Sequence, residues 1–277
     1  KCYCSPERLE QLRIDQRNSK SSKLGYDGYC KNRTTNANDE FLDKSYVVRF
    51  SMPYDGISLI DDIVRGRVEF PNEDVDDFVI LKTDGFPTYH LASVVDDHYM
   101  DITHVFRGEE WLPSVPRHVQ LYSALGWTPP IYAHLPYILA PDKSKLSKRH
   151  GATSVLEYKE KGYVPDAMVN FFSLLGWSLD GKTEIISRND LVKHFSINRI
   201  NDSGAVFDID KLNWMNGHYL RNMSQEELAN HLYEYWIEYI PLEFDQNPTL
   251  KDSKVIVELV QERIKTLKDA APLIAFL

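Results

Sequence analysis

The segment from Lys145 to Arg149 places two lysines, a serine and an arginine within five residues. It follows an apolar stretch and the pair Pro141-Asp142, a combination typical of a strand that ends in a turn. A loop of this composition can bring two ammonium groups onto a polyphosphate, because lysine binds phosphate as a compact and mobile charge. Taken by itself, however, such a string is also typical of a solvated basic loop.

This basic segment resembles the KMSKS signature of class I aminoacyl-tRNA synthetases. Its continuation to Val155 resembles the glutamyl-tRNA synthetases of bacterial type in particular. The resemblance runs from residue 1 to about residue 222 and weakens beyond it. It rests on several short sequence motifs that occur in the same order as in the family, which argues against a chance match. Five further strings resemble that family and follow one another in its order, at 84–92, 94–98, 107–112, 162–167 and 212–220.

The resemblance implies an α/β fold. A partial class I Rossmann-like nucleotide-binding fold would carry an α/β acceptor-binding insertion, followed by a mostly α-helical stem-contact and anticodon-binding region. We therefore expect four parts along the chain. These are an acceptor-end-binding insertion at 1–85, the second half of the catalytic domain at 86–140, a stem-contact region with the basic loop at 141–223, and the start of a helical anticodon-binding domain at 224–277.

Local sequence patterns predict the elements of these parts. Alternating apolar residues and turn residues predict strands at 45–53, 67–70, 78–82, 101–107 and 132–139. Capping residues, prolines at first helical positions and glycine stops predict helices that begin near Ser5, Phe86, Val115, Pro165, Ser187 and Ser224. The order strand, helix, strand over 101–139 predicts a parallel strand pair.

The resemblance also assigns site residues. Charge stabilisation in catalysis would come from Lys145 and Lys148. Glutamate would be bound by Tyr89, Ser93 and Arg107, because a planar guanidinium at a strand end can hold a carboxylate by two hydrogen bonds. The ATP side would be formed by Glu110, Trp111, Ile138, Lys145, Ser147, Lys148 and Arg149.

Each of these residues has a plainer interpretation when it is taken alone. Tyr89 and Trp111 are compatible with core packing. A lone arginine such as Arg107 more often forms a surface ion pair. Ser93 stands where some family members have asparagine, and either side chain can hydrogen-bond glutamate.

Three cysteines cannot make a closed disulfide framework, so they indicate a reducing compartment or thiols that bind a metal. Cys2, Cys4 and Cys30 resemble a zinc-binding corner that some family members carry in this insertion, and thiolates at this spacing suit tetrahedral zinc. Tyr26 resembles a tyrosine ligand in a close paralogue, whereas Asn32 stands where some relatives have histidine. Zinc binding and reduced structural cysteines both remain open.

The formal net charge of −9 argues against a general polyanion binder, which needs clustered Lys and Arg. Residues 1–33 and 143–149 are nevertheless locally basic, and residues 61–77 are strongly acidic. This distribution suits one shaped polyanionic partner. The sequence contains no run of eighteen apolar residues, so no membrane span is predicted.

The activity that the resemblance implies is ATP-dependent ligation of glutamate to tRNA(Glu) through glutamyl adenylate, in protein synthesis. ATP and Mg²⁺ would be required, and Zn²⁺ would be bound if the cysteines are ligands. We expect a monomer without membrane association, located in the cytoplasm, with an organellar form also compatible. Whether glutamine tRNA is charged as well does not follow from the sequence, and neither does the organism.

The chain lacks the His-x-Gly-His type motif that class I enzymes use to hold ATP phosphates. We expect this motif upstream of Lys1 and most of the anticodon-binding domain beyond Leu277, so that the present chain alone would be inactive. Two alternatives remain. One is a shortened paralogue that glutamylates a modified tRNA base but lacks the helical domain beginning near residue 224. The other is a tRNA-binding protein without synthetase activity.

Overall fold

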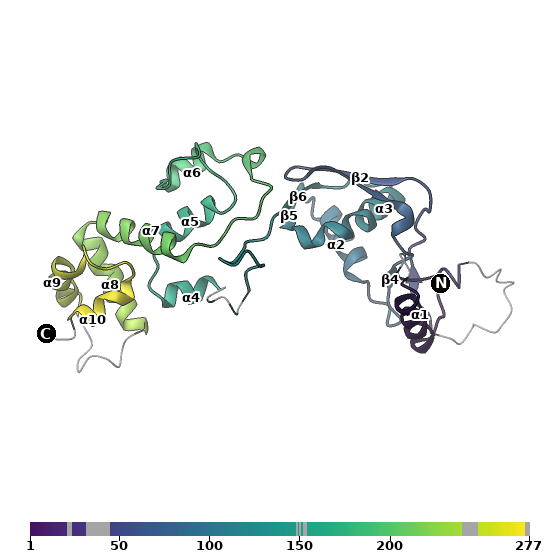
Figure 1. The fold of residues 1–277 in the computed structure, drawn as a ribbon, viewed down its shortest axis with the longest axis horizontal. Helices are drawn as coiled ribbons and strands as arrows, with labels where there is room; N and C mark the ends of the chain where they lie inside the picture. The colour runs from purple at the N-terminus through teal and green to yellow at the C-terminus, as the bar shows by residue number, and fades with distance from the viewer. Residues whose placement is uncertain are drawn as a thin grey trace. The chain divides into compact units, whose positions relative to one another are not determined.

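The computed structural model forms two compact units, Lys1–Leu135 and Pro136–Leu277, each of which is described by itself (Figure 1). Among the described residues, no helix has both the length and the apolar composition needed to cross a membrane. The structure describes residues 1–20, 24–31, 45–147, 149, 151, 154–239 and 249–274.

The first unit begins with helix α1 (Pro6–Asn18), which starts where the sequence predicts. The Ser5 hydroxyl accepts a hydrogen bond from the backbone N–H of Arg8, and Pro6 occupies the first turn, where its missing N–H costs nothing. Two antiparallel pairs follow. Strand β1 (Val48–Arg49) pairs with β4 (Val79–Leu81), and β2 (Ile57–Asp62) forms a hairpin with β3 (Gly66–Pro71).

The predicted strand at 45–53 is too long, because β1 contains only two residues. Its pairing with β4 shifts register between Val48 and Arg49, and the N–H of Met52 donates to the Asp77 side chain instead of to a neighbouring strand. No strand is predicted between residues 53 and 67, where the structure has the six-residue strand β2.

The second half of this unit has the predicted strand, helix, strand order. Helix α2 (Tyr89–Tyr99) precedes β5 (His104–Gly108), a 3₁₀ segment η3 (Glu109–Ser114), α3 (Val115–Leu125) and β6 (Ile131–Leu135). Strands β5 and β6 are parallel, as predicted, with Arg107 opposite His134. Helix α3 ends at Gly126, whose φ of 71° is the left-handed conformation that glycine adopts without strain.

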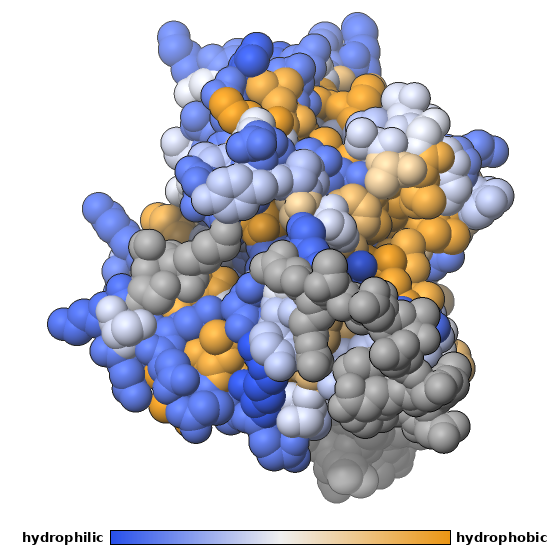
Figure 2. All heavy atoms as spheres, turned by 90° about the vertical axis from the view of Figure 1, so that its right-hand side faces the viewer, coloured by the Kyte–Doolittle hydropathy of each residue, from blue (hydrophilic) through white to orange (hydrophobic). Residues whose placement is uncertain are grey.

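Two hydrophobic clusters hold these elements together. One lies beneath α2 and α3 and includes Val94, Leu121 and Tyr122, and the other joins β2, α3 and β6 through Ile60, Val115 and Tyr132. The β2–β3 hairpin therefore packs on the strand pair that carries Arg107. On the face seen in Figure 2, hydrophilic residues are interleaved with patches of hydrophobic ones.

The second unit is helical, as predicted. Its helices are α4 (Val155–Glu160), α5 (Pro165–Leu174), α6 (Arg188–His194), α7 (Ile209–Asn222), α8 (Gln225–Tyr239), α9 (Leu250–Val260) and α10 (Ala270–Ile274), with 3₁₀ turns at η5 (Ile197–Arg199) and η6 (Leu267–Asp269). The predicted starts are confirmed, because Ser187 and Ser224 accept hydrogen bonds from the N–H groups of Asp190 and Glu227. Residues 240–248, which separate α8 from α9 in the sequence, lie outside the described residues.

Residues before and after position 224 share this unit. Gly162 has a φ of 83°, and a Cβ built on it would lie 2.6 Å from the backbone nitrogen of Lys268. Its carbonyl accepts a hydrogen bond from Leu267, and the carbonyl of Glu160 accepts one from the Tyr235 hydroxyl. These contacts fasten α4 to the C-terminal helices. The division into four parts expected from the sequence stays a prediction.

Candidate functional site

Arg107 is held at the end of β5 by the neighbouring parallel strand. Its Nε–H donates to Nε2 of His134 over 2.9 Å, and its guanidinium lies over the Tyr132 ring, 5.3 Å from the ring centroid. Its Nη2 atom is buried and has no hydrogen-bond partner among the described residues. The acidic residue nearest in sequence, Glu109, pairs with Arg65 instead. Arg107 is therefore not the surface ion pair that a lone arginine usually forms.

A buried aspartate supports His134 from behind. The His134 side chain is fully buried, and its Nδ1 lies 2.6 Å from Oδ2 of Asp62 in β2. The same carboxylate accepts hydrogen bonds from the backbone N–H groups of His134, Val64 and Arg65. Burial by itself would raise the pKa of Asp62, but these hydrogen bonds lower it below its usual value. A continuous chain of hydrogen bonds thus runs from β2 through β6 to Arg107.

The sequence interpretation missed Asp62 and His134. The available signal was a histidine within the apolar strand Tyr132–Leu135, where an unpaired polar side chain is costly.

Tyr89 and Ser93 lie one helical turn apart on α2. The Tyr89 ring is half exposed and lies 4.9 Å from the ring of Trp111, which is also partly exposed, so neither is a core residue. The Ser93 hydroxyl is buried without a hydrogen-bond partner among the described residues. Two of the three residues predicted to bind glutamate, Arg107 and Ser93, therefore carry a buried polar atom that no described residue hydrogen-bonds.

Two histidines lie beside this cluster. Nδ1 of His90 and Nε2 of His118 are 3.0 Å apart, and both rings contact the Tyr89 ring. Burial, and then the positive charge of Arg107, lower the pKa of His118 to about 3, so that this ring is neutral at physiological pH.

The first 3₁₀ turn after β5 holds Glu110 and Trp111 on the predicted ATP side. The Glu110 carboxylate folds back over Gly108, where a Cβ would lie 2.0 Å from Oε2. Glycine at this position therefore lets the Glu110 side chain approach the strand end.

The basic loop belongs to the second unit and rests on a small hairpin. The N–H of Leu146 donates to the carbonyl of Ile138, and Leu139 forms an antiparallel bridge with Lys145. The Leu146 side chain packs against the buried cluster around Phe171. The base of the loop is thus anchored in the fold.

The charged groups of this loop are less enclosed. Nζ of Lys145 lies 4.0 Å from the centroid of the Tyr137 ring, and Arg149 is exposed. Lys148, the second predicted catalytic lysine, lies outside the described residues. Ser147, in the same loop, is partly buried.

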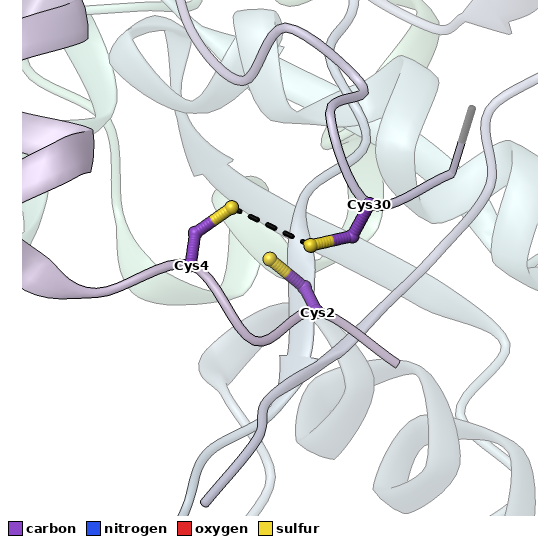
Figure 3. Close-up of side chains that lie close together, drawn as sticks. All are labelled: Cys2, Cys4 and Cys30. Carbon is purple, nitrogen blue, oxygen red and sulfur yellow. Dashed lines mark hydrogen bonds between the residues drawn. The ribbon is translucent and has the colours of Figure 1, made fainter. Parts of the chain in front are cut away.

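Cys2 and Cys4 lie close to Cys30, which is 26 residues beyond Cys4 in the sequence (Figure 3). Their sulfur atoms all lie within 4.8 Å of one another, and the Sγ atoms of Cys4 and Cys30 are 3.5 Å apart. The Tyr26 hydroxyl lies 4.0 Å from Sγ of Cys4. A tetrahedral zinc with Zn–S bonds of about 2.3 Å requires ligand separations of about 3.8 Å, so these side chains fit such an ion.

The electrostatics of the cluster agree with a cation site. Burial and the neighbouring thiols raise the pKa of Cys4 to about 12. Burial also acts on Cys2, but hydrogen bonds, among them one from Arg49, lower its pKa to about 7. The Cys2 and Cys4 thiols therefore ionise at very different pH unless a cation joins them.

Comparison with known proteins agrees with this architecture. Residues 1–214 match the family described as tRNA synthetases class I (E and Q), catalytic domain. This match and the fold define the catalytic region of a class I synthetase, and the chain belongs to the family of class I tRNA synthetases for glutamate and glutamine. The predicted resemblance is confirmed.

The relatives are more specific than the family. A glutamate–tRNA ligase from Dehalococcoides mccartyi is 49% identical over 276 residues, which cover 100% of this chain and 55% of that protein. One from Borrelia duttonii is 45% identical over 282 residues, covering 99% and 55%. The chain therefore spans little more than half the length of these curated relatives.

A solved structure has a similar fold. The crystal structure of a glutamate tRNA ligase from Elizabethkingia meningosepticum, in complex with its amino acid, matches with a TM-score of 0.83 and 35% identity. The match covers 98% of this chain and 58% of that one.

Proposed function

We propose that the protein containing this chain ligates glutamate to tRNA(Glu) in protein synthesis, using ATP and a glutamyl-adenylate intermediate. The observation that carries the proposal is a pair of buried polar atoms, Nη2 of Arg107 and Oγ of Ser93, that have no hydrogen-bond partner among the residues that the structure describes. They occur in a member of a synthetase family for glutamate and glutamine. A buried donor without a partner costs free energy. A bound carboxylate would remove that cost at Arg107.

In the first step, the α-carboxylate oxygen of glutamate forms a bond to the α-phosphorus of ATP. The bond between that phosphorus and the bridging oxygen breaks, and pyrophosphate leaves. The carboxylate is already ionised, so no general base is needed. Catalysis then consists of positioning and charge stabilisation. Mg²⁺ bound with ATP would neutralise part of the phosphate charge.

The predicted site residues would have separate roles in this step. Arg107, with Tyr89 and Ser93, would hold glutamate. Lys145 and Lys148 would stabilise the charge that develops on the phosphates. The ATP side would be completed by Glu110, Trp111, Ile138, Ser147 and Arg149.

In the second step, a hydroxyl of the terminal adenosine of tRNA(Glu) attacks the glutamyl carbonyl carbon. An ester forms and AMP leaves. The basic residues within 1–33, on an insertion that we propose binds the acceptor end, suit a tRNA backbone. We further propose that the protein acts as a monomer in the cytoplasm.

Zinc would have a structural role in this insertion. Cys2, Cys4, Cys30 and the Tyr26 oxygen would hold it. The guanidinium of Arg8 lies 3.5 Å from Sγ of Cys4 and would offset the negative charge of a thiolate-rich site.

The proposal is tested by ATP–pyrophosphate exchange with the full-length protein, in the presence and absence of tRNA(Glu). We expect exchange that depends on glutamate and that aspartate does not support. Aminoacylation of tRNA(Glu) by the same preparation should follow. Absence of glutamate-dependent exchange under both conditions would contradict the proposed function.

A further inference from the structure

We propose that Asp62 and His134 are positioning residues that fix the Arg107 guanidinium in the orientation needed to bind the substrate carboxylate. The inference rests on the proposed role of Arg107 in glutamate binding. It adds two residues that would not touch substrate themselves. One of them, Asp62, lies on the hairpin of the insertion and not on the strand pair that carries Arg107.

The hydrogen bonds define which ring nitrogen of His134 carries the proton. Nε2 accepts the Nε–H of Arg107, so it must present a lone pair. Nδ1 faces the Asp62 carboxylate over 2.6 Å, so it must carry the hydrogen. Asp62 therefore selects the tautomer that can accept from Arg107. The opposite tautomer would set one N–H against another at Arg107 and leave the carboxylate without its donor.

The position of the ring is fixed as firmly as its tautomer. The Asp62 carboxylate also accepts from the backbone N–H of His134, at 3.1 Å, and from the turn residues Val64 and Arg65. Arg65 in turn donates to the His134 carbonyl over 3.2 Å and pairs with Glu109. Asp62 and Arg65 thus hydrogen-bond both the backbone N–H and the backbone carbonyl of His134 in β6.

The consequence for Arg107 is the loss of most of its rotational freedom before substrate arrives. An arginine side chain loses rotamer entropy when it is immobilised. Anchoring at Nε removes that cost from the binding step. Nη2, which has no partner among the described residues, can then donate to the substrate carboxylate.

Two substitutions separate the two hydrogen bonds of His134. In His134→Asn, the amide can take the place of Nδ1 and still donate to Asp62, but no acceptor reaches Arg107. In His134→Gln, the amide oxygen can take the place of Nε2 and accept from Arg107. We expect H134N to raise the KM for glutamate about 10- to 100-fold, the size of one hydrogen bond to a charged group. H134Q should recover part of this loss, and the KM for ATP should not change in either variant.

Asn72→Ala provides a matched control. Asn72 is buried beside the same hairpin and bonds to Ser58 and to the Asp55 carbonyl, away from Arg107. Its loss should lower Tm while leaving the KM for glutamate unchanged. If His134 were only structural, H134N and H134Q would lower Tm in the same way with a normal KM for glutamate, and that result would overturn the proposal.

A measurement on the unmodified protein covers the case in which H134N does not fold. Long-range ¹H–¹⁵N correlation spectra report the tautomer of each histidine ring. We expect His134 to carry its proton on Nδ1, and a proton on Nε2 alone would overturn the proposal. Failure of the proposed function is recognised separately. In that case the wild type shows no glutamate-dependent exchange, or Arg107→Ala leaves it unaffected.

Discussion

Arg107 and the Lys145–Arg149 loop both present positive charge, but they differ in how firmly the surrounding structure holds them. Arg107 is anchored by a fully buried aspartate–histidine pair and lies within a parallel strand pair. Among the described residues of the loop, Leu146 fastens the base and Arg149 is exposed. Specific recognition of a small carboxylate requires fixed geometry, which rigid elements supply. Stabilising a triphosphate as it reacts suits charges that can move to follow it.

This contrast has an energetic consequence. Where a charge is buried and held, removing a partner exposes the full cost of an unpaired ion. Where a charge is exposed, the ground state gains little from it, and its effect is confined to the transition state. Substitutions in the two regions should therefore change different kinetic constants.

The largest effect is expected for Arg107→Ala in the full-length protein. It should lower kcat/KM for glutamate by about a hundredfold or more, because an unpaired buried carboxylate costs on the order of 3–5 kcal/mol. ATP binding should be nearly intact. Arg107→Lys should restore only part of the loss, because an ammonium group cannot reproduce a two-pronged contact. A lower Tm with normal glutamate kinetics would remove Arg107 from the site.

Lys148→Ala should lower kcat for amino-acid activation by roughly a hundredfold, as expected for the loss of one transition-state donor. The KM for glutamate should barely change. Pre-steady-state measurement of adenylate formation tests this directly. An unchanged kcat would identify the loop as an ordinary solvated basic turn.

Zinc removal tests the proposed metal site formed by Cys2, Cys4 and Cys30 in the first unit. We expect one zinc per chain by metal analysis, and we expect Cys30→Ser to lose it and to lower Tm by about 4 °C or more. Cys30 is chosen because its sulfur lies near both other sulfurs. Metal-free protein with an unchanged Tm would leave the cysteines as reduced structural residues.

The smallest effect is expected for Ser93→Ala. Its hydroxyl is buried without a partner among the described residues, so a bound glutamate would gain one neutral hydrogen bond. We expect the KM for glutamate to rise about three- to tenfold, corresponding to ~1 kcal/mol. Tm should stay the same or rise, because an unpaired buried hydroxyl is lost. An unchanged KM would show that Ser93 does not contact the substrate.

Much of the fold could be predicted because it follows from local chemistry. The capping hydroxyls of Ser5 and Ser187 define helix starts, and Pro165 opens α5 as a first-turn proline. The parallel pairing of β5 and β6 follows from the helix between them. None of these inferences needs a partner distant in sequence.

The parts that could not be predicted depend on distant contacts. Strand β1 is short because Asp77 captures the N–H of Met52, 25 residues away. Asp62 and His134 are 72 residues apart, and the local sequence around each of them does not indicate that they pair. The residues at the site were identified through resemblance, whereas the network that holds Arg107 became visible only in three dimensions.

The contrast between these two charged regions is tested most directly by ATP–pyrophosphate exchange across a grid of glutamate and ATP concentrations, with the wild type, R107A and K148A measured side by side. We predict that R107A loses kcat/KM for glutamate with an unchanged KM for ATP. K148A should lose kcat with an unchanged KM for glutamate. If both variants lose the same kinetic constant to the same extent, the two regions do not differ in the way proposed.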